Sequence, residues 1–310
     1  MLAAALRDRE GVNVLFVLDG DESAAATLRE ADFETLVLPD HSHAEWLASL
    51  VGTRSPDMLI ADARYRLTRA ELAGLTAQVR TTAVLDDISE RRLAATHAYY
   101  TPLPQVAELS WQGSSCKVRI GWEWSLLGFD PARYGRNENR SGEAQLIVTM
   151  GGSDPKDFTR LALKAVARVT TPLRARFVIG PDFADPGALA RKIEAAGFEA
   201  LHNLADLAAE FARADLALIS FGVTAYEMAA LGVHSLYMTL SEDHARSASA
   251  FCQVGMGDIV SPDPTAIAEA LTTLIGDLGR RRAMREIGPR LIDGKGAERI
   301  AAELAAAVLM

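Results

Sequence analysis

Short apolar runs alternate with helical patterns in the first third of the chain. The runs lie at residues 12–18, 35–38, 56–62 and 82–85, and the helical patterns between them lie at 23–31, 44–51 and 68–78. Strands that are buried on both faces of a parallel sheet read as continuous apolar runs, and helices connect them. The first three runs therefore predict a β-α-β-α-β unit, which a further helix and strand extend, in a parallel sheet that is covered on both faces.

The same alternation returns in the second half of the chain. Residues 93–133 are less periodic, and the polar, turn-rich residues 131–142 predict a linker. Strands are then expected at 145–149, 175–179, 199–202, 217–220 and 235–239, with helices at 157–169, 187–196, 206–213 and 225–231. The sequence thus predicts an α/β protein with two doubly wound, Rossmann-like domains at residues 1–136 and 143–310.

Composition agrees with two globular domains. The 310 residues are 49% apolar and 24% charged, enough for two packed cores. The formal net charge of −9 disfavours nonspecific nucleic-acid binding as the main activity, although a local basic patch could still hold a phosphate. Cys116 and Cys252 form no C-x-x-C pattern and no secretory signal is present, which favours packed thiols in a reducing cytoplasm. No apolar run reaches the roughly 20 residues that span a bilayer.

Candidate chemistry follows three predicted strands of the second domain, because doubly wound domains bind ligands at the carboxyl ends of their strands. The first loop is Gly151, Gly152, Ser153 and Asp154. Its glycines would let the backbone approach a ligand, and the next helix would offer N–H groups to a phosphate. The alternative is a tight turn in which the serine or the aspartate caps that helix.

The second loop contains Ser220, Gly222, Val223 and Thr224, with Glu227 three residues further on. The threonine is expected to cap the following helix or to bond a phosphate, and the glutamate to complete a capping box or to bind a ribose diol. A lone Thr-x-x-Glu more often reports capping alone. Two glycine turns of this kind in one domain favour a nucleotide.

The third loop follows residues 235–239 and contains Asp243 and His244. The histidine is a candidate acid or base at neutral pH. A solvated helix start is the alternative, so this loop ranks below the second.

Other polar groups are better explained without a ligand: the turn Asp19-Gly20-Asp21, the pairs His41/His43 and Asp86/Asp87, and the run Arg280 to Arg282. The turn offers fewer oxygen atoms than a hard cation needs. The two pairs lack a third partner at metal-ligand spacing and are assigned to surface loops, and the arginine run predicts a solvated helix face. No P-loop, G-x-G-x-x-G or G-x-S-x-G motif is found, so neither a metal nor a cofactor is predicted.

Taken together, these loops resemble the glycosyltransferase-B superfamily. Residues 218–233 are similar to the nucleotide-binding segment of its branch near the MurG lipid II synthase, and within it of the UDP-sugar hydrolases of pseudaminic acid biosynthesis (PseG-like). The first loop supports the resemblance, as do Asp62 and Tyr65 in an Asp-x-x-Tyr stretch after the third predicted strand. The resemblance covers nearly the whole chain.

The resemblance implies roles for the candidate residues. Backbone at Gly222, Val223 and Thr224 would hold the diphosphate of a UDP-sugar, and Glu227 would bind the ribose hydroxyls. Asp243 and His244 stand where relatives often show Asn-Gln and would contact the sugar or phosphate. Tyr65 and Asp62 would face the sugar from the first domain. Water would attack the UDP-sugar and release UDP and a free amino-sugar derivative, without a metal.

Two features depart from the family pattern. Relatives begin with a strand and a Gly-His turn whose histidine is regarded as the general base, whereas this chain starts directly in a predicted helix. The first domain is therefore expected to lack one strand, which would leave its neighbours with unpaired backbone groups. Gly128 follows a Leu-Leu pair where relatives tend to carry arginine. Relatives also occur fused to a cytidylyltransferase, which makes such an enzyme an expected fusion or association partner.

Three functions remain open at this point. The leading hypothesis is hydrolysis of a UDP-activated deoxy-diacetamido sugar in nonulosonic acid biosynthesis. A glycosyltransferase would use the same diphosphate site, with an acceptor hydroxyl in place of water. A catalytically inactive module that only binds nucleotide sugars is the third, because the expected histidine turn is missing.

Overall fold

The computed structural model describes residues 1–9, 11–20, 22–39, 43–62, 67–135 and 143–309. The chain divides into two compact units, one formed by Met1–Leu126 with Lys295–Met310 and the other by Leu127–Gly294. The division falls ahead of the expected linker, of which residues 136–142 lie outside the described residues. Among the described residues, no helix is long and apolar enough to cross a membrane. Cys116 and Cys252 are free and half-buried.

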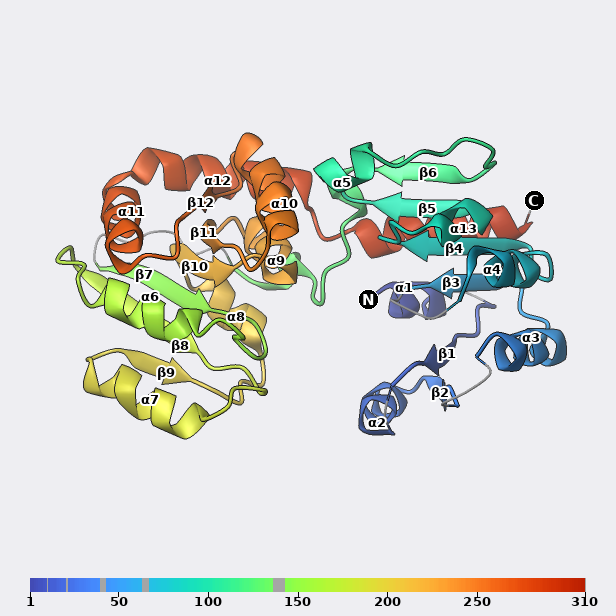
Figure 1. Cartoon of the computed structure of the whole chain (residues 1–310), viewed down its shortest axis with the longest axis horizontal. Helices are drawn as coiled ribbons and strands as arrows, with labels where there is room; N and C mark the ends of the chain where they lie inside the picture. Colours follow the sequence, from blue (N-terminus) through green and yellow to red (C-terminus); the bar gives the residue numbers. More distant parts are fainter. Residues whose placement is uncertain (10, 21, 40–42, 63–66, 136–142, 310) are drawn as a thin grey trace. The chain divides into compact units, whose positions relative to one another are not determined.

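The first unit is an α/β structure with parallel strands (Figure 1). Its strands are β1 (Leu15–Leu18), β2 (Glu34–Val37), β3 (Met58–Ala61), β4 (Thr81–Leu85), β5 (His97–Tyr100) and β6 (Lys117–Ile120). Its helices are α1 (Leu2–Arg7), α2 (Glu22–Glu30), α3 (His43–Arg54), α4 (Arg69–Thr76), α5 (Pro104–Ala107) and α13 (Gly296–Leu309), with 3-10 turns η1 (Glu90–Ala94) and η2 (Trp122–Trp124). The irregular region expected at 93–133 thus contributes the two strands β5 and β6.

Two separate sheets form in this unit, β1-β2 and β3-β4-β5-β6. The inner strands β4 and β5 are buried along their whole length, whereas β1 and β3 are only half-buried despite their apolar sequences. Within the described part of the chain, β1 pairs only with β2, and β3 only with β4. Among the described residues, each of these two strands therefore keeps one edge unpaired.

Helix α13 belongs to the first unit, although the sequence placed the whole C-terminus in the second domain. Ile300 and Leu304 are fully buried against Leu85 and Tyr99 on the four-stranded sheet. The Glu303 carboxylate accepts a hydrogen bond from Arg119 Nη2 on β6 at 2.6 Å. The apolar stripe of α13 indicates that the helix is buried on one side, but it does not indicate which sheet covers it.

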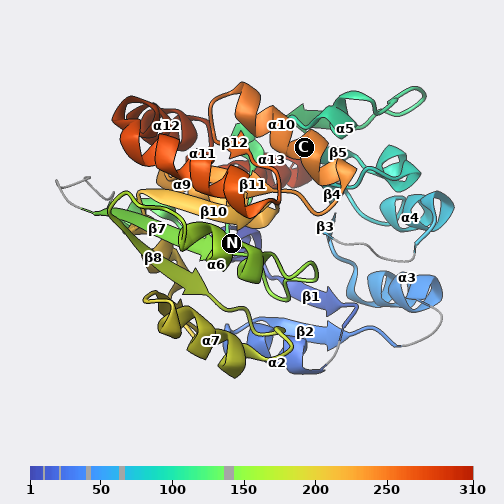
Figure 2. The ribbon, with the colours of Figure 1, turned by 60° about the vertical axis from the view of Figure 1, so that its left-hand side comes forward.

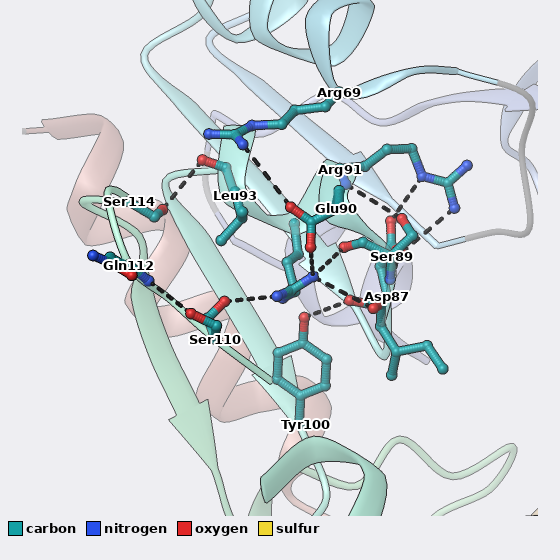
Figure 3. A network of polar contacts seen from close by, with 12 residues as sticks. Arg69, Asp87, Ser89, Glu90, Arg91, Leu93, Tyr100, Ser110, Gln112 and Ser114 are labelled. Carbon is teal, nitrogen blue, oxygen red and sulfur yellow. Dashed lines mark hydrogen bonds and ion pairs between the residues drawn. The ribbon is translucent and has the colours of Figure 1, made fainter. Parts of the chain in front are cut away.

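A polar network fixes the loop after β4 (Figure 3). The carboxylate of Asp87 accepts from Ser89 N at 2.9 Å and from Arg91 Nε at 3.1 Å, and its carbonyl accepts from the Tyr100 hydroxyl at 2.7 Å. Arg92 Nη2 donates to the carbonyl of Ser110 at 2.6 Å. Asp87 is 7% exposed, so its assignment to a surface loop is wrong. Its carboxylate is instead a buried anchor that satisfies local donors.

The second unit is built on one six-stranded parallel sheet, and Figure 2 shows β10, β7 and β8 of this sheet side by side. Its strands are β7 (Ala144–Thr149), β8 (Leu173–Val178), β9 (Glu199–Leu201), β10 (Leu216–Ser220), β11 (His234–Met238) and β12 (Asp258–Ile259), in the order β12-β11-β10-β7-β8-β9. Its helices are α6 (Phe158–Val166), α7 (Pro186–Ala195), α8 (Leu207–Ala212), α9 (Val223–Leu231), α10 (Glu242–Gln253), α11 (Pro264–Gly276) and α12 (Leu278–Leu291), with the 3-10 turn η3 (Pro131–Arg133). The doubly wound unit predicted for this half is confirmed.

Helices cover both faces of this sheet. Buried side chains of α6, α7 and α11 form one core with β7, β8, β10 and β11. Helix α9 packs instead against α8 and α12. The contact with α12 is close, because a Cβ on Gly288 would lie 2.1 Å from the carbonyl oxygen of Ala229. The chain therefore leaves β7 toward one face of the sheet and leaves β10 toward the other.

Part of the predicted arginine face on α12 is buried. Arg281 is 4% exposed, and its Nη2 donates to the carbonyl of Ile275 at 2.9 Å. Arg280 pairs with Asp258 on β12 and stays half-exposed. The solvated-face interpretation is thus wrong for Arg281, which caps the end of the preceding helix from within the core.

Candidate functional site

The strand order of the second unit reverses between β7 and β10. Strands β8 and β9 follow β7 on one side, and β11 and β12 follow β10 on the other. At such a switch point the two loops diverge to opposite faces and leave a crevice at the carboxyl ends of the strands. The first and second predicted loops both lie here: a Cβ on Gly151 would lie 3.9 Å from Ser220 Oγ.

The glycine pair of the first loop is packed against the loop after β8. Gly151 has a φ of +79°, which favours glycine. A Cβ on Gly180 would lie 2.4 Å from the carbonyl oxygen of Gly152, which also accepts from Asp182 N at 2.9 Å. This loop therefore has a fixed backbone, with Gly151, Gly152 and Ser153 exposed at the carboxyl edge.

Asp154 caps α6. Its side chain is buried, its φ is +44°, and its carboxylate accepts from Phe158 N and Thr159 N, each at 2.8 Å. These are the N–H groups that a phosphate at this helix would need. Asp154 therefore has the role that the capping alternative describes, although Asp157 is the first residue at the helix boundary. The Asp154 carboxylate already accepts hydrogen bonds from the first N–H groups of α6.

The second loop has the opposite character, because no side chain caps α9. The helix begins at Val223, with Gly222 in extended backbone as its N-cap, so Thr224 lies in the first turn and the expected capping box does not form. Ala225 N donates to the carbonyl of Gly222 at 3.0 Å. Elsewhere in the described chain, nothing accepts from the N–H groups of Val223 and Thr224, and Val223 is 67% exposed. The positive end of α9 is therefore open to an anion.

Glu227 lies one turn into the same helix. Its carboxylate is half-buried and has no hydrogen bond or ion pair with any described residue, and burial raises its pKa. A Cβ on Gly128 would lie 3.7 Å from Glu227 Oε1, so the glycine leaves the carboxylate uncovered on that side. A buried acceptor without a donor is costly, and a pair of ligand hydroxyls would satisfy it.

The third loop starts α10. Ser241 caps the helix by accepting from His244 N at 3.2 Å, so the alternative of a helix start is correct for the backbone. The His244 ring lies beside Phe221 of the second loop, with ring centroids 6.3 Å apart. Its Nδ1 is buried and meets no partner among the described residues. Asp243 is exposed on the first turn. His244 thus adjoins the second loop.

In the first unit, two aspartates follow adjacent strands. Asp62 follows β3, and Asp86 follows β4 with a φ of +49°. Burial raises the pKa of Asp86 to about 6, and the charge of Asp62 adds to the rise while a backbone hydrogen bond from Thr101 opposes it. Burial also raises the pKa of Asp62. Asp86 is exposed after the strand, which agrees with its assignment to a surface loop, but its raised pKa was not expected from the sequence.

Some sequence candidates are not described. Tyr65, the proposed sugar contact of the first domain, lies outside the described residues. The same holds for Asp21 and His41 of the discounted groups.

Solved structures with this arrangement identify the fold class. The chain is similar to Alr3699/HepE of Anabaena, solved in complex with UDP, at a TM-score of 0.69 and 16% identity, over 99% of this chain and 94% of that one. It is also similar to the spinosyn forosaminyltransferase SpnP, at a TM-score of 0.70 and 13% identity, over 100% of this chain and 94% of that one. The fold is the glycosyltransferase-B fold with Rossmann-like parallel sheets, as predicted.

One relative is also similar in sequence to part of the chain. The chain is 29% identical over 168 residues to SpsG, a spore coat polysaccharide biosynthesis protein of Bacillus subtilis (strain 168). The match covers 51% of this chain and 49% of SpsG, so it spans about half the length of that relative. No protein-family model matches the chain.

Proposed function

We propose that the protein binds a UDP-sugar at the carboxyl edge of β7 and β10 and hydrolyses it to UDP and the free sugar. The observation that carries the proposal is the open N-terminus of α9, followed one turn later by the unpaired carboxylate of Glu227. The amides of Val223 and Thr224 suit a diphosphate, and the carboxylate suits the two ribose hydroxyls. The amides and the carboxylate are one helical turn apart, so one nucleotide can contact both with its diphosphate and its ribose.

The remaining site residues take supporting roles in this proposal. The exposed backbone of Gly151, Gly152 and Ser153 faces the same strand edge and would contact the phosphate or sugar. His244, beside Phe221, would act in proton transfer, together with Asp243. Asp154 has a capping role only, because its carboxylate is engaged by α6.

The sugar class follows from the resemblance described above and from the relative in polysaccharide biosynthesis. We infer a UDP-activated deoxy-diacetamido sugar of the nonulosonic acid pathways, and a cytidylyltransferase as the associated activity. In this step the oxygen of water bonds to the sugar carbon while its proton passes to a base, the role proposed for His244. The bond between that carbon and the diphosphate oxygen breaks, and UDP leaves with its electron pair.

Glycosyl transfer is the second candidate, because SpnP, which shares the fold, is named as a forosaminyltransferase. The two reactions are separated by product analysis. The purified protein is incubated with UDP-activated N-acetylated deoxy sugars, and UDP and free reducing sugar are quantified with and without an acceptor alcohol.

Hydrolysis predicts equal amounts of UDP and free sugar without acceptor. Strict dependence on the acceptor, with the sugar recovered as a glycoside, would replace the hydrolase by a transferase. UDP binding in calorimetry with no turnover of any sugar would leave an inactive nucleotide-sugar module. Absence of UDP binding would exclude all three.

A further inference from the structure

Lys156 is a cation at the carboxyl edge of the second sheet that was not among the candidates from the sequence. Lys156 lies in the loop after β7, between the glycine pair and α6. The two aspartates that flank it are already engaged, since Asp154 caps α6 and the Asp157 carboxylate accepts from Arg160 Nε at 2.9 Å. Lys156 itself is exposed. Its charge is therefore not neutralised by its neighbours in sequence.

The side chain of Lys156 extends from the loop after β7 to the loop after β11. Its Nζ donates a hydrogen bond to the carbonyl of Leu240, which follows β11, and lies 6.0 Å from the centroid of the Phe158 ring. Strand β10 lies between β7 and β11 in the sheet. The lysine therefore reaches from the loop after β7 to the loop after β11, the two strands that flank β10, across the carboxyl end of β10. The turn at Gly222 and the start of α9 follow directly from that end.

The ammonium group keeps capacity for a ligand at this place. A lysine has three donors and no acceptor, and the Leu240 carbonyl uses one of them. Within the described residues, Lys156 meets no carboxylate. An exposed ammonium that is held by a neutral carbonyl favours an anionic ligand locally, against the negative net charge of the whole protein.

We propose that Lys156 binds the diphosphate of the nucleotide, opposite the open N-terminus of α9. This inference rests on the proposed function. It adds Lys156 as a phosphate ligand and predicts that the site prefers a nucleoside diphosphate to a nucleoside. The diphosphate would lie between amide donors of α9 and the lysine ammonium, both at the carboxyl end of β10. A ligand without phosphates gains nothing from Lys156, so this residue makes the site selective for a nucleoside diphosphate over a nucleoside.

The test compares UDP, UMP and uridine by calorimetric titration of the full-length protein and of the variants Lys156→Ala and Lys156→Arg. Lys164→Ala is the matched control, because Lys164 is an exposed lysine on α6 itself. Removing the ammonium should weaken UDP binding by roughly 10-fold or more, as expected for loss of a charge-assisted hydrogen bond, and leave uridine binding unchanged. The arginine variant should retain much of the UDP affinity, and the control all of it.

The outcomes separate this inference from the proposed function. If the unmodified protein binds UDP but Lys156→Ala binds it equally well, the lysine is not a phosphate ligand. Equal weakening of UDP and uridine by Lys156→Ala would also overturn the inference, because it would report a change in loop structure. If the unmodified protein does not bind UDP, the proposed function itself fails. A second measurement, the salt dependence of UDP binding, should be weaker in Lys156→Ala than in Lys164→Ala.

Discussion

At the residue scale, the side chains of the site differ in whether the protein already satisfies them. Asp154 and Glu227 were both sequence candidates for nucleotide binding. Asp154 accepts two backbone N–H groups, whereas Glu227 has no partner among the described residues. Both are acidic residues after a glycine turn, so the sequence pattern alone does not separate them. The separation depends on where each helix begins, which shifts by one or two residues under local packing.

Glu227→Ala tests the proposed ribose contact. Loss of the carboxylate should weaken UDP and uridine binding together, each by roughly 10-fold, because both ligands carry the ribose hydroxyls. This pattern differs from that of Lys156→Ala, which should affect UDP alone. The control is Glu194→Ala, at an exposed glutamate on α7. Unchanged uridine affinity in Glu227→Ala would contradict the ribose assignment.

The raised pKa of Asp86 predicts a pH-dependent loss of stability. Because the folded-state pKa is about 6 and the ordinary value is 3.8, the folded protein holds this proton more tightly than the unfolded chain. The contribution of Asp86 to stability is therefore greatest below about pH 4 and is lost as the pH rises to 6. Since Asp86 is exposed and solvent screens part of the effect, we expect the loss to be about 1 kcal/mol.

Asp86→Asn should remove this loss, so that the variant is more stable than the unmodified protein above pH 6. Asparagine tolerates the left-handed backbone of position 86. Urea unfolding at pH 4.5 and pH 7 measures the difference. Asp32→Asn, at another aspartate of the same unit with positive φ, controls for the backbone. A stability difference that does not change between the two pH values would argue against a raised pKa for the Asp86 carboxyl group.

At the element scale, the second sheet was predictable because each of its longer strands contains an apolar stretch between helical patterns. The same rule predicted β1 to β4 to within a few residues. It did not resolve β5 and β6, because these short strands are separated by prolines and single helical turns that break the period. The start of α9 was also misplaced, since Thr224 has the side chain of a cap but Gly222 occupies that position. The hydrophobic pattern therefore predicts that a helix or strand is present, whereas local packing decides at which residue it begins.

A substitution in the first turn of α9 should weaken UDP binding without lowering the free energy of unfolding. Thr224→Asp places a negative charge in the first turn, where the helix dipole favours it, so the protein should not be destabilised. The same charge should repel the diphosphate and weaken UDP binding by roughly 10-fold or more. Thr224→Asn is the uncharged control and should bind UDP far better. Equal UDP affinity in the aspartate and threonine proteins would mean that no anion binds at this helix.

The close contact between the loops after β7 and β8 predicts a further structural effect. Gly180→Ala would bring a Cβ to 2.4 Å from a backbone oxygen, so the loop must shift, at a cost of about 1–3 kcal/mol. Gly187→Ala in α7 is the control, because its Cβ would meet only the Arg191 side chain at 3.6 Å and alanine favours a helix. Urea unfolding measures both. Equal stability of the two variants would show that the loop adapts without cost.

At the scale of the whole molecule, each unit has its own core, so the two should unfold as separate transitions. Leu304 is fully buried in the first unit, and Leu304→Ala should lower only that unit's transition, by about 2–5 kcal/mol. Leu309→Ala on the same helix, at an 85% exposed side chain, should have little effect. Calorimetry with and without UDP makes the assignment, because UDP should raise only the transition of the second unit. A single transition that shifts with both changes would contradict this independence.

The return of α13 to the first unit has a consequence for the order of events during synthesis. Proteins emerge from the ribosome N-terminal end first, and domains usually fold in that order. Here residues 127–294 are complete when the last helix of the first unit has not yet been made. The second unit can therefore finish folding before the first, although it comes later in the sequence. The apolar surface that Ile300 and Leu304 cover stays open until α13 has been made.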